Sequence, residues 1–226
     1  MAATARPRRS ALYMPGSKPR ALEKAPTLAA DVLLLDLEDA VAPTEKGEAR
    51  RIVADAVAAR GFGPREVVVR VNGLDTEWGA DDIKAASAAG ADAVLLPKVD
   101  DAAQVAAAVA CMEAAGAPES CAVWAMMETP LGVLNAAQIA AAPRMAGFVM
   151  GTNDLAKDLR SGEDTARQPM LTALGLCLLA ARANGLACLD GVYVAFKDEA
   201  GLRAECEQGR TLGFDGKTLI HPAQLA

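Results

Sequence analysis

Short apolar runs and amphipathic segments alternate along this chain. The runs are rich in aliphatic and β-branched residues, as is typical of buried strands. Eight of them occur, at residues 10–14, 32–38, 66–71, 92–98, 121–128, 145–150, 185–190 and 216–220. Between the runs lie alanine-rich segments with helical periodicity, such as 45–60 and 101–116, several of which begin near Asp or Thr and end at Gly. The pattern therefore predicts alternating strands and helices.

This alternation predicts a parallel sheet, because parallel neighbours need a long crossover connection that is usually a helix. Eight strands in 226 residues favour a (β/α)8 TIM barrel in one domain spanning 1–226. An open doubly wound sheet is the alternative, and it is less favoured because no G-x-G-x-x-G motif follows the first run. Residues 1–9 are expected to form a flexible N-terminus. Only 221–226 follow the last strand, so we expect the final helix or a C-terminal extension to be lacking.

Composition and charge narrow the class of protein. The formal net charge of −6 argues against a nucleic-acid surface, which needs a basic field. No apolar run approaches the ~18 residues of a membrane span, and the basic N-terminus has no apolar stretch after it. The five cysteines show no C-x-x-C spacing and are expected to be reduced core residues. We therefore expect a soluble, cytoplasmic protein with no nucleic-acid or membrane partner.

Charged residues gather at the predicted ends of the strands. In a (β/α)8 barrel the reactive groups lie at the C-terminal ends of the strands, where the βα loops form the mouth. The positions predicted to lie there are Asp36, Glu38, Asp39, Arg70, Lys98, Glu128, Asp154, Asp190 and His221. A purely structural protein has no reason to concentrate charge at this rim, so the pattern indicates an active site.

Asp36 and Glu38 end an otherwise apolar strand. Side chains alternate along a strand, so both should share the face of Leu34 and point into the barrel. A buried carboxylate costs several kcal/mol unless a cation satisfies it. Two interpretations follow: the pair belongs to the catalytic group, or it forms buried ion pairs with Arg70 and Lys98.

Glu128 and Asp154 end successive predicted strands. Adjacent strands lie about 5 Å apart, so two carboxylates there would repel each other unless a cation lay between them. Oxygen ligands suit Mg²⁺ or Mn²⁺, and no cluster of Cys and His offers a zinc site. The structural alternative is that Asp154 caps the next helix and Glu128 pairs with Arg70.

Several motifs in one order give the chain a resemblance to a known family. They are ALYMPGSKPRALEKA, LLLDLEDAVAPTEKGEAR, VVVRVNG, LLPKV, METPLGVLNA, GTNDLAKDL and GFDGKTLIHPAQL. In these motifs, from Leu12 to Leu225, the chain resembles the citrate lyase β-subunit-like (CitE-like) branch of the HpcH/HpaI aldolase superfamily. The resemblance implies a (β/α)8 barrel that depends on Mg²⁺. It also implies cleavage or formation of a carbon–carbon bond in a CoA thioester such as malyl-CoA or citramalyl-CoA, with acetyl-CoA and a 2-keto acid as the other reactants. A homotrimer is implied as well.

Position by position, the resemblance assigns roles to matching residues. Glu128 and Asp154 become metal ligands, and Arg70 becomes the contact to a substrate oxygen. Asp36 and Glu38 are catalytic candidates from their position at the end of the strand rather than from the resemblance. The positions that would hold the CoA phosphates are Arg20, Lys24 and Lys46. The aldolase branch has a histidine where this chain has Asp39, so the chain matches the thioester-lyase branch.

Other functions stay open from the residues alone. One alternative is a citrate lyase β-subunit that acts on citryl-acyl-carrier protein, and another is a non-catalytic CoA-thioester-binding barrel. Lys98 could instead form a Schiff base with a keto acid in a metal-free lyase. His221, the only histidine, is expected to be structural in the turn before Pro222, although its ordinary pKa would also suit an acid or base. Asp190 is expected to orient Arg70 or Lys98.

Overall fold

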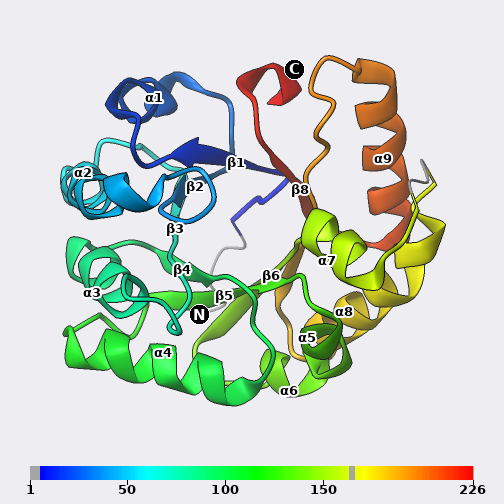
Figure 1. The fold of residues 1–226 in the computed structure, drawn as a ribbon. Coiled ribbons are helices and arrows are strands. Elements are labelled where there is room, and N and C mark those ends of the chain that lie inside the picture. Colours follow the sequence, from blue (N-terminus) through cyan, green and yellow to red (C-terminus); the bar gives the residue numbers. More distant parts are fainter. Residues whose placement is uncertain (1–5, 163–165, 226) are drawn as a thin grey trace.

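The chain forms a closed barrel of eight parallel strands in strict sequence order (Figure 1). A computed structural model describes residues 6–162 and 166–225. The strands are β1 (Ser10–Pro15), β2 (Val32–Asp36), β3 (Glu66–Arg70), β4 (Ala93–Leu96), β5 (Ala122–Met127), β6 (Met145–Met150), β7 (Ala187–Asp190) and β8 (Gly216–Leu219). Because β1 pairs with β8 and closes the ring, the predicted (β/α)8 barrel is confirmed and the open sheet is excluded.

Helices surround the strands and connect successive ones (Figure 1). The α-helices are α1 (Pro19–Lys24), α2 (Lys46–Ala58), α3 (Gly79–Ala89), α4 (Ala102–Ala114), α5 (Pro130–Leu134), α6 (Ala136–Ala140), α7 (Thr152–Leu159), α8 (Leu171–Ala183) and α9 (Glu199–Leu212). Short 3₁₀ turns are η1 (Ala25–Thr27), η2 (Pro43–Glu45), η3 (Gln168–Met170) and η4 (Pro222–Leu225). No helix within residues 6–162 and 166–225 is both long and apolar enough to cross a membrane.

Two apolar layers follow from the alternation of side chains along each strand. Leu34, Val68 and Trp124 belong to the layer inside the barrel. Leu33 and Leu35 belong to the larger layer between the strands and the surrounding helices. The prediction that Leu33 and Leu35 face the helices while Leu34 faces the barrel interior is therefore confirmed. The same alternation directs Asp36 inward.

Ion pairs anchor the N-terminal end of the barrel. Arg8 donates to both carboxylate oxygens of Glu66 at 2.6 and 2.8 Å, and its guanidinium lies 5.3 Å from the ring of Trp124. Arg9 makes a similar two-bond contact with Asp31. Arg6 also pairs with Asp92 at 3.0 Å, so the described part of the expected flexible segment is held by ion pairs, while residues 1–5 lie outside the described part of the chain.

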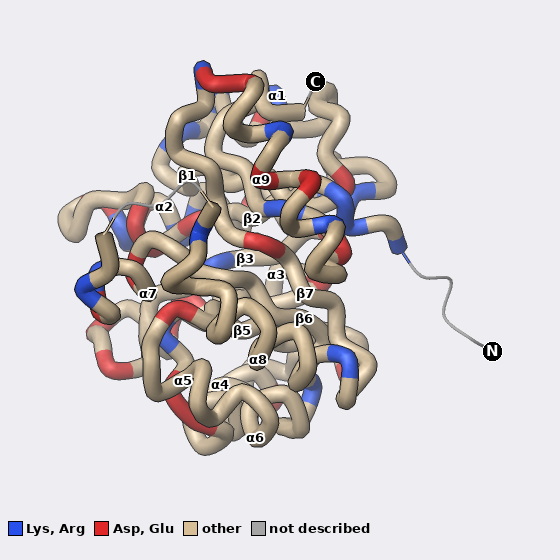
Figure 2. The backbone as a smooth tube through the Cα atoms, turned by 90° about the vertical axis from the view of Figure 1, so that its right-hand side faces the viewer, with Lys and Arg blue, Asp and Glu red and all other residues tan. Residues whose placement is uncertain are grey.

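Charged side chains also fill the space between the barrel and α9. Asp190 on β7 lies opposite Lys217 on β8, and its carboxylate accepts from Lys217 Nζ at 3.2 Å and from Arg167 at 2.7 Å. Glu205 on α9 pairs with both cations. All four side chains are at most 12% exposed. Figure 2 shows acidic and basic positions close together around α9. This buried network joins α9 to the barrel in place of apolar packing.

The partners of Asp190 differ from those that were predicted. Leu189 points into the barrel, so the next side chain points outward to α9 and does not contact Arg70 or Lys98. The expectation that Asp190 orients one of those cations was wrong because it ignored the alternation of side chains along β7.

His221 has the structural role that was expected. Its ring stacks on Phe196 with ring centres 4.5 Å apart, and its Nδ1 accepts from the main chain of Ala223 at 3.1 Å. The cysteines are all unpaired thiols, but Cys206 is exposed and so differs from the predicted core position.

Candidate functional site

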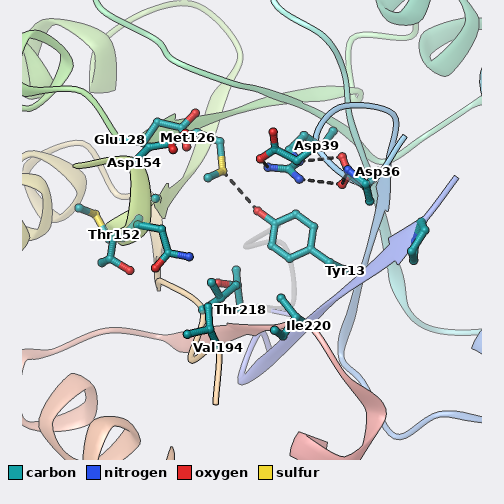
Figure 3. Close-up of a pocket in the computed structure, with 17 residues that line it drawn as sticks. Tyr13, Asp36, Asp39, Met126, Glu128, Thr152, Asp154, Val194, Thr218 and Ile220 are labelled. Atoms are coloured by element: carbon teal, nitrogen blue, oxygen red, sulfur yellow. Dashed lines mark hydrogen bonds and ion pairs between the residues drawn. The ribbon is translucent and has the colours of Figure 1, made fainter. Parts of the chain in front are cut away.

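A cavity of about 340 Å³ opens at the C-terminal end of the barrel. Residues from the ends of β1, β2, β3, β5, β6, β7 and β8 line it (Figure 3). They are Tyr13, Pro15, Asp36, Asp39, Ala40, Arg70, Met126, Glu128, Met150, Gly151, Thr152, Asn153, Asp154, Val192, Val194, Thr218 and Ile220. The cavity therefore lies where strand alternation and the barrel fold predict an active site.

Arg70 and Asp36 form a two-bond ion pair in this cavity. They are the last residues of β3 and β2 and lie opposite each other in the sheet register. Nε of Arg70 donates to Oδ1 of Asp36 at 2.8 Å, and Nη2 donates to Oδ2 at 2.7 Å. Asp36 also accepts from the main-chain nitrogens of Glu38 and Ala40 at 2.9 and 3.1 Å. Its oxygens are thus fully used, and Asp36 holds the guanidinium in place.

Two further carboxylates surround Arg70. Nη1 lies 3.0 Å from Glu38 and 3.3 Å from Asp39. The ammonium of Lys98 lies 3.8 Å from Glu38 and 3.9 Å from Asp154. Burial raises the pKa of Glu38, which Arg70 only partly offsets. The buried ion pairs expected for Asp36 and Glu38 are present, at the edge of a cavity that is open to a ligand.

Glu128 follows β5 and is 4% exposed. Its Oε1 accepts from the main-chain nitrogen of Lys98 at 2.8 Å. Lys98 has a φ of 48°, a left-handed conformation that residues other than glycine seldom adopt. Burial raises the pKa of Glu128 to about 7; the hydrogen bond from Lys98 opposes this, and the charges of Glu38 and Asp154 add to it. The Glu128 carboxylate is therefore held in a buried position where the charges of Glu38 and Asp154 repel it.

Asp154, at the start of α7, lines the same cavity as Glu128 (Figure 3), and its charge helps to raise the pKa of Glu128. Gly151, just before α7, lies directly against Glu128, because a Cβ at that position would collide with Cβ and Oε2 of Glu128. The nearest cation, the ammonium of Lys98, lies 3.9 Å from Asp154 and is 57% exposed. Two neighbouring carboxylates of which one has a raised pKa can accept a positive ion between them.

The donor set fits a hard divalent cation. Both groups supply oxygen, the ligand that Mg²⁺ and Mn²⁺ prefer. Within the described residues, no group of three or more His, Cys, Asp and Glu side chains is placed to hold a metal ion. A cation between Glu128 and Asp154 would thus take its other ligands from water or a bound substrate, as Mg²⁺ commonly does.

The three predicted phosphate contacts separate into two environments. Arg20 and Lys24 are exposed on α1, one helical turn apart, and neither forms an ion pair within the described chain. Lys46 is 6% exposed, and its Nζ donates to the carbonyl oxygens of Leu37 and Glu38 at 3.0 and 2.9 Å. Lys46 therefore fixes the loop after β2, and the structure departs here from the expected phosphate contact.

Tyr13 also belongs to the site, although it was not among the residues predicted from the sequence. Its ring lies 4.7 Å from the guanidinium carbon of Arg70, and its hydroxyl points into the cavity (Figure 3). The alternation in β1 could have found it, because Tyr13 shares the inward face of Ala11.

Comparison with known proteins places the chain among related sequences. The family model described as HpcH/HpaI aldolase/citrate lyase matches residues 9–222. A (3S)-malyl-CoA thioesterase of Cereibacter sphaeroides (strain ATCC 17023) is 60% identical over 225 residues, which cover 100% of this chain and 77% of that protein. The citrate lyase subunit beta of Escherichia coli (strain K12) is 39% identical over 226 residues, with 97% and 75% covered.

Solved structures show the same fold. The citrate lyase beta subunit from M. tuberculosis complexed with oxaloacetate and magnesium superposes with a TM-score of 0.80 at 34% identity, covering 97% of this chain and 94% of that one. Protein CitE from Mycobacterium tuberculosis in complex with magnesium, acetoacetate and coenzyme A gives 0.79 at 34% identity, covering 97% and 78%.

Proposed function

Because the chain belongs to the HpcH/HpaI aldolase/citrate lyase family, we propose that it is a divalent-cation-dependent enzyme acting on the CoA thioester of a 3-hydroxy acid. Malyl-CoA and citramalyl-CoA are the proposed substrates, and the reaction is cleavage or formation of a carbon–carbon bond, with acetyl-CoA and a 2-keto acid on the other side. The observation that carries the proposal is that Glu128, Asp154 and Arg70 line one cavity at the mouth of the barrel. Relatives whose structures contain magnesium and coenzyme A support it.

Glu128 and Asp154 are the residues that would hold Mg²⁺, or Mn²⁺ in its place. Bound there, the ion would polarise the hydroxyl and carboxylate oxygens of the substrate and lower the pKa of the hydroxyl. Glu38 is the proposed acceptor of the hydroxyl proton, because its raised pKa makes it a stronger base than an ordinary glutamate. Arg70 would meet the negative charge that develops on the thioester oxygen, and Asp36 keeps its guanidinium oriented.

Hydrolysis of the thioester is a second candidate reaction at the same site. The four relatives at 59–60% identity are (3S)-malyl-CoA thioesterases. In hydrolysis, negative charge also develops on the thioester oxygen, so Arg70 would serve both reactions. A citryl thioester on an acyl-carrier protein is a further substrate candidate, which the citrate lyase subunit beta relatives support.

Product analysis distinguishes these reactions. The purified protein is incubated with Mg²⁺ and either malyl-CoA or citramalyl-CoA, and the products are identified by mass spectrometry. Acetyl-CoA with glyoxylate or pyruvate supports carbon–carbon cleavage, whereas free CoA with malate or citramalate supports hydrolysis. Activity that survives EDTA, with borohydride trapping of Lys98, would support the Schiff-base lyase instead. Binding of thioester without any product would contradict an enzymatic role.

Cation affinity should depend on pH through Glu128. The folded carboxyl keeps its proton up to about pH 7, because burial raises its pKa to about 7, and a cation must displace that proton. We expect Mn²⁺ affinity to fall roughly tenfold for each pH unit below 7 and to level off above it. Titrations between pH 5.5 and 8 followed by electron paramagnetic resonance measure this. Affinity that is constant across the range would contradict the assignment of Glu128.

Arg20 and Lys24 are the proposed contacts to the CoA phosphates, since both are exposed cations without a partner in the described chain. Lys24→Glu should weaken CoA binding, which calorimetry measures. Because salt screens exposed charges, we expect a loss of affinity of roughly 20-fold at 20 mM salt and of about 3-fold at 500 mM salt. Lys84→Glu on α3 is a matched control, because it makes the same change of charge elsewhere. A loss of equal size at both salt concentrations would argue against phosphate contact.

We also propose that the protein works in the cytoplasm as a homo-oligomer, with a trimer implied by the resemblance. Leu134 on α5 and Leu179 on α8 are 76% and 70% exposed, which supports an interface with another subunit. Light scattering coupled to size-exclusion chromatography measures the assembly.

A further inference from the structure

Tyr13 supplies a hydrogen-bond donor at the centre of the cavity. It is the fourth residue of β1 and points into the barrel. Its hydroxyl donates to Sδ of Met126 at 3.4 Å, and no oxygen of the described chain accepts from it. A thioether sulfur is a weak acceptor, so the bonding capacity of this hydroxyl is largely unused.

Two neighbouring side-chain donors of the cavity, Arg70 and Thr218, are already committed. Arg70 donates through Nε and Nη2 to Asp36, and its Nη1 lies between two more carboxylates. The hydroxyl of Thr218 donates to the main-chain oxygen of Asp190 at 2.9 Å. A ligand oxygen that enters the cavity therefore finds the Tyr13 hydroxyl ready to donate without first breaking a bond to another oxygen.

The ring of Tyr13 is fixed by Arg70. The guanidinium carbon lies 4.7 Å from the ring centre, a distance at which a cation is attracted to an aromatic face. In Figure 3 the hydroxyl points across the cavity toward Met126, on the side where Glu128 and Asp154 lie. The donor is thus held between the acidic pair and the guanidinium, where the reacting part of a substrate would lie.

The phenol stays protonated in this position. Burial raises the pKa of Tyr13, and the charges of Asp36 and Glu128 raise it further, although Arg70 lowers it. A protonated phenol next to an oxygen that gains negative charge donates a hydrogen bond and does not compete for the proton.

We propose that Tyr13 is a catalytic residue whose hydroxyl donates a hydrogen bond to the thioester oxygen as that oxygen gains negative charge. The inference rests on the proposed function and adds a residue to it.

In the cleavage direction, the electron pair of the carbon–carbon bond moves to the α-carbon of the thioester and is shared with the thioester oxygen. The hydroxyl proton of the substrate passes to Glu38, the hydroxyl carbon becomes the carbonyl of the 2-keto acid, and the enolate carbon later takes up a proton to give acetyl-CoA. Tyr13 keeps its own proton throughout. In hydrolysis the same oxygen becomes negative in the tetrahedral intermediate, so the same donor serves.

Tyr13→Phe tests the hydroxyl alone, because phenylalanine keeps a ring against Arg70. We expect kcat to fall about 100-fold, the loss typical for one donor to a developing oxyanion, while KM stays within about threefold of wild type. Tyr13→Leu removes the ring as well and should lower kcat further, because Arg70 then loses its packing partner. Tyr193→Phe is the matched control: Tyr193 is the other tyrosine, and its hydroxyl bonds to Asp198 at 2.7 Å, outside the cavity. Its kcat should equal that of wild type.

The outcomes separate this inference from the proposed function. With an active wild type, a Tyr13→Phe variant whose kcat lies within threefold of wild type overturns the role of the hydroxyl. A rise in KM with unchanged kcat also overturns it, because the Tyr13 hydrogen bond would then be equally strong with the bound substrate and with the transition state. A wild type that turns over neither thioester overturns the proposed function, and the inference with it.

Discussion

Glu128→Gln should abolish most cation-dependent turnover, with a loss of about 1,000-fold or more. The variant keeps the shape of the side chain and its contact with the Lys98 nitrogen, but it removes one of the two anionic ligands proposed for the cation. A metal that polarises a reacting oxygen contributes several kcal/mol, and each 1.36 kcal/mol is a factor of ten in rate. Steady-state assays with malyl-CoA over a range of Mg²⁺ concentrations measure the loss, and Asp154→Asn should behave in the same way.

The fold should survive this change. Because burial opposes the charged form of Glu128 and raises its pKa to about 7, a neutral amide in its place should leave the melting temperature within a few degrees of wild type. Asp55→Asn on α2 removes an exposed carboxylate that pairs with Arg51 and is the matched control for a change of charge. Equal activity of Glu128→Gln and Asp55→Asn would count against a role in cation binding.

Asp190→Asn should destabilise the protein by roughly 3–5 kcal/mol, because it leaves Lys217 and Arg167 buried with one carboxylate, Glu205, between them. For a domain of this size that loss lowers the melting temperature on the order of 10 °C. Urea unfolding followed by circular dichroism gives the difference in free energy of unfolding.

An exposed pair provides the comparison. Glu48→Gln breaks its contact with Arg51, which is 60% exposed, and such surface pairs contribute about 0–1 kcal/mol. A loss for Asp190→Asn no larger than that for Glu48→Gln would mean that the network does not hold α9 to the barrel.

Strand order and the inward direction of Asp36 could be predicted because they depend on short-range patterns. Eight apolar runs separated by helical segments leave few topologies, and a side-chain period of two decides which residues face the barrel interior. Arg70 was expected as a partner of Asp36 because it ends the next strand, and the register places the two opposite each other.

The roles of Lys46 and Asp190 could not be predicted in this way. Lysine is nearly always exposed, and only the folded loop shows that the Lys46 ammonium is bonded to two carbonyl oxygens. The partners of Asp190 come from positions 167, 205 and 217, which no local pattern connects. Tyr13 was missed for a different reason: an aromatic residue in an apolar strand indicates core packing, and although alternation could place its ring inside the barrel, only the folded contacts show that its hydroxyl has a weak acceptor, the sulfur of Met126.

Glu128 and Asp154 are proposed to bind one divalent cation together, in the cavity that contains Arg70. The most direct test is Mn²⁺ binding at pH 7.5, followed by electron paramagnetic resonance, for wild type, Glu128→Gln and Asp154→Asn. We expect one site per chain in wild type and at least about 100-fold weaker binding in each variant, because each removes a ligand. Wild-type affinity in both variants would show that the cation is held elsewhere and would contradict the assignment of Glu128 and Asp154.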